Sequence, residues 1–117
     1  MFLLFMCIYV LIRLQTEQGG NTMNTTYMLT VTYRAKEGCA RAFVEELESS
    51  GVAALVRGEN GCIRYDYYFS AKDENTVLLF EEWESQTHQQ IHITQPHIQT
   101  LKQIKEKYIL DTQLRVL

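Results

Sequence analysis

Residues 76–84, TVLLFEEWE, have the pattern of a β-strand that carries apolar side chains on both of its faces. Alternate residues fall on opposite faces, with Val77, Leu79, Glu81 and Trp83 on one and Leu78, Phe80 and Glu82 on the other. A strand that is apolar on both faces is covered on both faces. In a chain of 117 residues, helices can cover one face, and a second subunit is the expected cover for the other.

Three further segments also have strand patterns. Residues 28–34, MLTVTYR, alternate apolar with polar side chains, and so do residues 110–116 near the end of the chain. Residues 62–70, CIRYDYYFS, are rich in residues that favour strands. Their alternation predicts one shared face for Ile63, Tyr65, Tyr67 and Phe69.

Helical periodicity occupies the two stretches between these strands. From Ala40 onward, steps of three and four define a single helix face, made of Ala40, Phe43, Val44, Leu47, Gly51, Ala54 and Leu55. Ser85 is a suitable N-cap for a short helix that runs to His92. Pro96 favours a second helix start, and the buried stripe of that helix is Ile98, Leu101, Ile104 and Tyr108.

The resulting order, β-α-β-β-α-β, predicts an α+β fold of the ferredoxin-like kind. In this arrangement a four-stranded antiparallel sheet has its helices on one face. The open face predicts a homodimer formed by stacking two sheets.

The first 22 residues differ from the rest. Residues 1–12, MFLLFMCIYVLI, are apolar throughout, but as a helix they would reach only about 18 Å, short of a bilayer core of about 30 Å. A signal peptide is not indicated, because no basic residue comes before the apolar run and no small-residue cleavage site follows it. We expect residues 1–22 to be a leader and linker outside the fold, with a weak membrane anchor as the alternative, and residues 23–117 to form the domain.

Composition and the lack of certain motifs argue against several classes of function. A net charge of −3 gives no basic excess, which argues against a nucleic-acid partner. The three cysteines, Cys7, Cys39 and Cys62, form neither a CxxC pair nor an even set, so a reduced cytoplasmic protein is expected. The chain contains no GxGxxG, Walker or GxSxG pattern, and nucleotide-binding and serine-hydrolase functions therefore lack support.

Two ionisable residues are candidates for proton transfer. Glu81 shares a strand face with Leu79 and Trp83, and burial would raise the pKa of its carboxyl group. The alternative is a solvated carboxylate, or one paired with an arginine, near the strand end. His92 ends the short helix and can reach toward that strand, although a histidine there can also be a simple surface or capping residue. His97 lies in a helix first turn, which disfavours its charged form.

Two other groupings have alternative interpretations. Glu84, His88 and His92 are spaced i, i+4, i+8, as a metal site on one helix face would need, but the sequence suggests no further ligand and we expect no metal. The aromatic set of Tyr65, Tyr67, Phe69 and Trp83 is most simply core, and it could equally line a pocket for a flat organic ligand.

Three motifs together resemble the antibiotic biosynthesis monooxygenase family of small dimeric α+β barrels. They are Glu59-x-Gly61-Cys62-x-x-Tyr65-Asp66, Glu81-x-Trp83-Glu84-Ser85 and His92-x-x-x-Pro96-His97, and the resemblance extends from about Met28 to Leu117. It implies a pocket between sheet and helices. It also implies one of several activities: oxidation of quinols or anthrones by O₂ without a cofactor, isomerisation of a phosphorylated autoinducer, or haem degradation. The haem activity is disfavoured, because Val31 stands where that branch has an asparagine and residues 101–108 contain no histidine.

We therefore predict a cofactor-independent monooxygenase that oxidises a small quinol, polyphenol-like or enolic substrate with O₂. By analogy with the family, His92 is the base and Glu81 orients it or relays its proton. Trp83, Tyr65, Tyr67 and His97 are expected to bind the substrate. Two alternatives are an isomerase that abstracts a proton next to a carbonyl and a non-enzymatic dimeric ligand-binding module.

Overall fold

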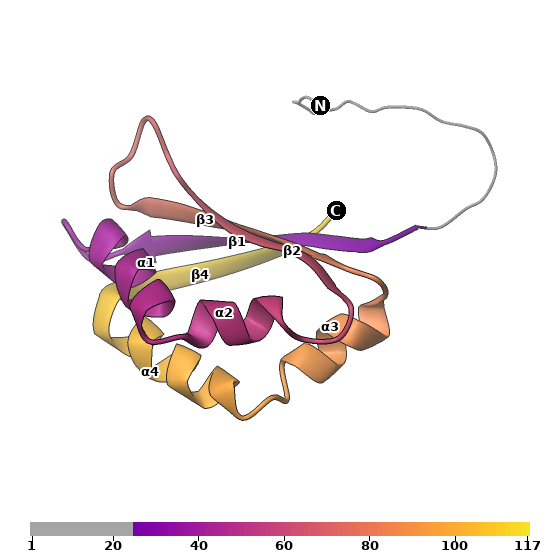
Figure 1. The fold of residues 1–117 in the computed structure, drawn as a ribbon. Coiled ribbons are helices and arrows are strands. Elements are labelled where there is room, and N and C mark those ends of the chain that lie inside the picture. Colours follow the sequence, from indigo (N-terminus) through magenta and orange to yellow (C-terminus); the bar gives the residue numbers. More distant parts are fainter. Residues whose placement is uncertain (1–24) are drawn as a thin grey trace.

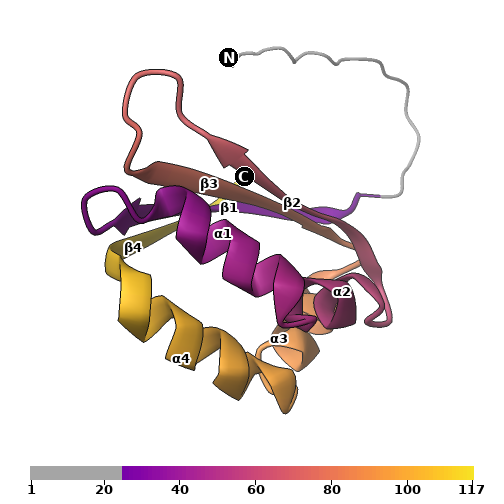
Figure 2. The same ribbon diagram turned by 60° about the vertical axis from the view of Figure 1, so that its left-hand side comes forward.

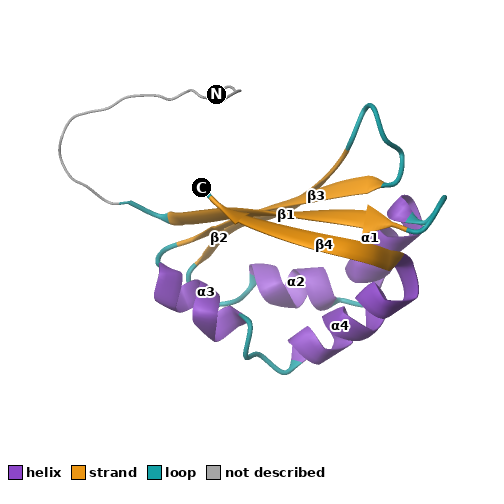
Figure 3. Ribbon diagram, turned by 180° about the vertical axis from the view of Figure 1, so that it is seen from behind, coloured by secondary structure: helices purple, strands orange, loops and turns teal. Residues whose placement is uncertain are grey.

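A computed structural model describes residues 25–117 of the chain. The prediction for residues 1–22 lies outside this described part. The elements, in chain order, are β1 (Tyr27–Ala35), α1 (Ala40–Ser49), α2 (Val52–Arg57), β2 (Cys62–Phe69), β3 (Thr76–Trp83), α3 (Gln86–His92), α4 (His97–Tyr108) and β4 (Ile109–Val116). Figure 1 shows all four helices on one side of the sheet, and the view from behind in Figure 3 agrees.

The four strands form one antiparallel sheet in the order β2-β3-β1-β4. The predicted ferredoxin-like α+β fold is thereby confirmed. The strand that is apolar on both faces, β3, lies in the interior of the sheet, between β1 and β2. Its sequence suits this interior position, because strands buried on both faces have near-continuous apolar runs.

The core lies between the sheet and the helices. The helix-facing side chains of β3 are almost fully buried, with Val77 and Trp83 at 0% exposure and Leu79 at 1%. Phe43 and Leu47 of α1 pack against the sheet at 0% exposure. Helices α1 and α4 run side by side along this face (Figure 2). Among residues 25–117, no helix is long and apolar enough to span a membrane.

The prediction of a single helix from Ala40 to Leu55 is wrong, because the structure has two helices in this segment. The helical segment is interrupted once. It is divided at Gly51, whose φ of 88° lies in the left-handed region that ends an α-helix. The second helix, α2, starts with a new phase and buries Val52, Ala53 and Val56. Leu55, which we had placed on the buried face, is 56% exposed.

The predicted common face of β2 needs one correction. The register with β3 shifts between Cys62 and Arg64, so Ile63 falls in a β-bulge and is 50% exposed. Cys62 takes its place opposite Trp83, and Tyr65 and Tyr67 keep the expected face opposite Glu81 and Leu79. A bulge has no signature in this alternating pattern, which is why the sequence reading missed it.

Candidate active site

Glu81 and Trp83 occupy the helix-facing side of β3 and bond to each other. The Trp83 indole Nε1–H donates to Glu81 Oε1 over 2.9 Å, and Glu81 is only 5% exposed. Burial raises the pKa of the Glu81 carboxyl group, and the nearby Glu59 carboxylate adds to this effect. The Trp83 hydrogen bond and the charge of His92 oppose it, but they do not cancel it.

His92 is placed against this pair by the last turn of α3. Ser85 caps that helix by accepting a hydrogen bond from the backbone N–H of His88, as predicted for its N-cap. The His92 ring is 4% exposed, with its centroid 4.7 Å from that of Trp83 and 6.0 Å from that of Tyr65. Glu81 and His92 therefore share one buried cluster with the aromatic residues.

The carboxylate that bonds His92 is that of Glu59. His92 Nδ1 lies 3.0 Å from both carboxylate oxygens of Glu59, and His97 Nε2 lies 2.5 Å from its Oε2. We had assigned the orienting contact to Glu81, whose hydrogen bond goes to Trp83 instead. Sequence reasoning gave Glu59 no role, because a turn residue has no periodicity. The available signal was a carboxylate in a tight turn directly before a buried strand.

The turn that carries Glu59 is held by backbone hydrogen bonds and by Gly61. The Cys62 N–H donates to the Glu59 carbonyl over 3.1 Å, and the Glu84 N–H donates to the Gly61 carbonyl over 2.8 Å. Gly61 has a φ of 84°, and a Cβ atom there would overlap the His88 ring. The close approach of this turn to α3 is what brings Glu59 within reach of His92.

Three tyrosines line the interior near Glu81. Tyr65 and Tyr33 are almost fully buried, and the Tyr67 hydroxyl donates to the Tyr65 hydroxyl over 3.4 Å. Burial raises the pKa of all three phenols, and the Glu81 charge raises each of them further. These groups therefore stay neutral throughout the physiological range. Phe69, the outermost member of the predicted aromatic set, is 38% exposed beneath the Arg41 guanidinium.

The i, i+4, i+8 spacing of Glu84, His88 and His92 does not bring these three side chains together. His88 Nδ1 lies 2.8 Å from Ser85 Oγ, whereas His92 bonds Glu59 on another side of the helix. Within residues 25–117, no three His, Cys, Asp or Glu side chains are grouped so that they could hold a metal ion. The sequence spacing was misleading because Glu84 precedes the helix, which begins at Gln86.

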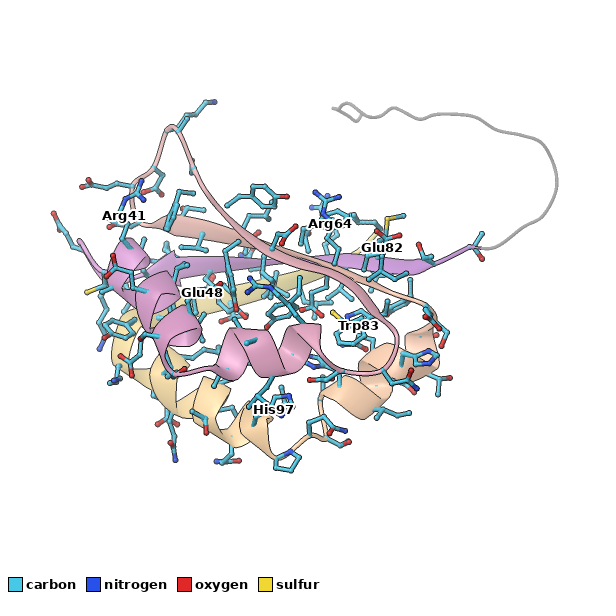
Figure 4. The ribbon with its side chains drawn as sticks, in the orientation of Figure 1. Arg41, Glu48, Arg64, Glu82, Trp83 and His97 are labelled. Atoms are coloured by element: carbon cyan, nitrogen blue, oxygen red, sulfur yellow. The ribbon has the colours of Figure 1, made fainter. Side chains whose placement is uncertain are left out.

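Side chains fill the space where the family resemblance implies a pocket. Trp83, Tyr65 and His92 are all less than 5% exposed, which leaves little room for a water molecule beside them. A pocket of about 160 Å³ adjoins the cluster at Glu59 and is lined by Glu59, Asn60, His88, Ile91 and Gln95. Figure 4 shows Trp83 beneath the sheet and His97 at the start of α4, with Arg64 and Glu82 on the opposite side of the sheet.

Comparisons with known proteins agree with this fold. The family model described as antibiotic biosynthesis monooxygenase matches residues 26–103. No curated protein matches the chain. Among solved structures, protein PA3566 from Pseudomonas aeruginosa is 25% identical with a TM-score of 0.70, over 83% of this chain and 96% of its own.

Two further solved structures show the same fold at lower identity. Protein SO0527 from Shewanella oneidensis is 21% identical with a TM-score of 0.71, and the match covers 81% of this chain and 91% of that one. A structure described as an antibiotic biosynthesis monooxygenase is 17% identical with a TM-score of 0.67, and the match covers 78% of this chain and 95% of that one.

Proposed function

The chain belongs to the antibiotic biosynthesis monooxygenase family, and from this premise we propose that it is a monooxygenase that oxidises a small electron-rich quinol or polyphenol with O₂ and no bound cofactor. The observation that carries the proposal is the buried imidazole of His92, bonded through Nδ1 to Glu59 and packed against Trp83. A base in a dry aromatic environment is what this chemistry requires.

The reaction needs a base because O₂ is a triplet and reacts slowly with closed-shell organic molecules. Removal of a phenolic proton turns a hydroquinone into an electron-rich anion that O₂ oxidises more readily. In the balanced reaction, the hydroquinone and O₂ give a hydroxyquinone and water. The substrate supplies all four electrons, so no external reductant is needed.

His92 is the proposed base. With its Nδ1–H donated to the Glu59 carboxylate, a neutral imidazole has its lone pair on Nε2. The contact with Glu59 fixes the ring orientation and stabilises the imidazolium that forms when Nε2 takes a proton.

Glu81 is the proposed proton relay. Burial raises the pKa of its carboxyl group, so it holds a proton to a higher pH than an ordinary glutamate does. A buried carboxylic acid beside the base can return a proton to the oxygen atom that leaves as water.

The aromatic side chains are the proposed substrate contacts. Trp83, Tyr65 and Tyr67 surround His92 and Glu81 with flat apolar surface and exclude water, which strengthens electrostatic interactions inside the site. His97 lies at the outer side of the same cluster, across Glu59. Because these side chains fill the interior, binding requires some of them to move, and Trp83 is the only tryptophan in the chain. Its fluorescence therefore reports on binding.

A homodimer formed through the open face of the sheet is part of the proposal. Leu78 and Phe80 of β3 point to this face and are only half-buried, and Tyr68 beside them is 42% exposed. Arg64, Asp66 and Glu82 on the same face give it charges of both signs, as a self-complementary surface needs.

The test is oxygen consumption by chelator-treated protein with a panel of hydroquinones. We expect uptake of one O₂ per quinol, with a loss of about 10²–10⁴-fold in rate for His92→Ala and an unchanged rate for Gln90→Ala, at an exposed position of the same helix. Product formation without O₂ uptake would establish the isomerase alternative instead. Quenching of Trp83 fluorescence with no product would leave only a binding module, and activity lost on chelation would contradict the metal-free mechanism.

A further inference from the structure

Three ionisable side chains connect the buried base to the outside of the molecule. The side-chain exposure rises from 5% at His92 to 10% at Glu59 and 15% at His97. Both imidazoles contact the same carboxylate, and both contacts have hydrogen-bonding distances. Glu59 therefore joins an imidazole that solvent scarcely reaches to one that is closer to the surface.

A single carboxylate balances the charge of one imidazolium. If His92 and His97 were both protonated, two cations would share one anion in a largely dehydrated environment, where like charges interact strongly. Protonation of either ring therefore opposes protonation of the other. His97 is also the first residue of α4, and the dipole of that helix disfavours a cation at its N-terminus.

The other ionisable groups near Glu59, His92 and His97 do not change the balance of one carboxylate against one imidazolium. From β3, the Glu81 carboxyl group accepts its hydrogen bond from Trp83 and none from the histidines. From β2, Tyr65 contributes a neutral phenol, and burial raises the pKa of the Cys62 thiol near Glu59 to about 11, so it is neutral as well. From α3, His88 lines the pocket that Glu59 borders but bonds to Ser85.

We propose that Glu59 and His97 couple proton uptake at His92 to proton release at His97. In the resting state the single imidazolium is His97, with its Nε2–H donated to Glu59. When His92 Nε2 takes the substrate proton, His97 gives its Nδ1 proton to solvent, and Glu59 stays ionised between them. One proton enters and one leaves, so the trio keeps a single imidazolium. This inference rests on the proposed function for the source of the proton, and it makes Glu59 and His97 positioning residues for the base.

The first test uses no substrate and follows the three histidine rings by NMR as the pH is changed. We expect the proton-uptake curve of His92 to move to higher pH in His97→Asn, by on the order of one pH unit. The same curve should move to lower pH in Glu59→Gln and stay in place in His88→Asn. A His92 curve that is the same in wild type and His97→Asn overturns the proposal, whether or not the protein oxidises quinols.

The second test is the pH profile of kcat/KM for O₂ consumption. In His97→Asn the acid limb should move to higher pH by the shift seen in the NMR curve. In Glu59→Gln the acid limb should move to lower pH and the maximum value of kcat/KM should fall, because the His92 ring loses its charged partner. An equal loss of rate at every pH in His97→Asn would indicate a merely structural role and overturn the coupling. If the wild type consumes no O₂ with any quinol, the proposed function fails and the NMR result alone decides the coupling.

Discussion

Nδ1 of His92 lies 3.0 Å from both carboxylate oxygens of Glu59, although the two residues are 33 positions apart in the chain. The contact joins the end of α3 to the turn before β2, and it gives the buried imidazole a fixed orientation. It also separates two roles that the sequence had given to one acid. Glu59 is the hydrogen-bonding partner of His92, while Glu81 accepts the hydrogen bond of the Trp83 indole on the other side of the cluster.

Replacement of Glu81 by glutamine should raise the melting temperature near neutral pH. Burial raises the pKa of Glu81, so the native state holds this proton more tightly than the unfolded chain does. The stability that the group contributes is therefore fully present below the unfolded glutamate pKa of about 4.3 and decreases as the pH rises through the higher native value. Glutamine keeps an oxygen acceptor for Trp83 without the charge.

The measurement is thermal unfolding of both proteins from pH 4 to pH 8. The advantage of Glu81→Gln should increase with pH, and Glu45→Gln at an exposed position of α1 is the control that should show no such trend. A constant difference between wild type and Glu81→Gln across this range would contradict the expectation.

Gly61→Ala should destabilise the protein more than Gly38→Ala. Both glycines have a positive φ, of 84° and 75°, so each substitution costs about 1–2 kcal/mol of backbone strain. At Gly61 the new methyl group also meets the His88 ring, whereas no atom lies within 4 Å of it at Gly38. We expect a further loss of about 1–3 kcal/mol in urea unfolding of Gly61→Ala. Equal losses of unfolding free energy in the two variants would show that the turn adjusts to the methyl group without cost and would contradict this prediction.

Phe80→Asp should convert the proposed dimer to a monomer with its secondary structure intact. Phe80 lies on the open face, and the Arg64 guanidinium carbon is 4.5 Å from the centroid of its ring. Because Arg64 is already paired with Asp66, a carboxylate at position 80 would be buried in a stacked pair of sheets without a cation of its own. Sedimentation equilibrium measures the change. Leu55→Asp is the matched control, because Leu55 is an exposed leucine on α2, on the helical side of the sheet, and its replacement should leave the dimer unchanged. A monomeric wild type would contradict the dimer itself.

Cys62 should react slowly with iodoacetamide in the native protein. Burial raises the pKa of its thiol to about 11, so roughly one molecule in a thousand carries the reactive thiolate at pH 8. In urea the same cysteine should react at the rate of an ordinary thiol. Peptide mass spectrometry at timed intervals distinguishes Cys62 from the other cysteines, and equal rates for Cys62 with and without urea would refute its protection.

Much of the fold followed from local periodicity. The alternation along residues 76–84 correctly placed Glu81 and Trp83 on one buried face, because successive side chains of a strand point to opposite sides. The order of strands and helices was sufficient for the ferredoxin-like topology. Periodicity failed at Gly51 and at Ile63, where a left-handed residue and a bulge shift the phase of the pattern.

The sequence by itself determined the order of strands and helices and the strand face that Glu81 shares with Trp83, because both follow from patterns within single elements. Only the tertiary structure decided which side chains touch. Glu59 stands in a turn, where no repeat indicates the direction of a side chain, and it meets His92 and His97 from two different helices. Such contacts depend on how the turn packs against α3 and α4, a relation between distant segments that the pattern within any one element does not contain.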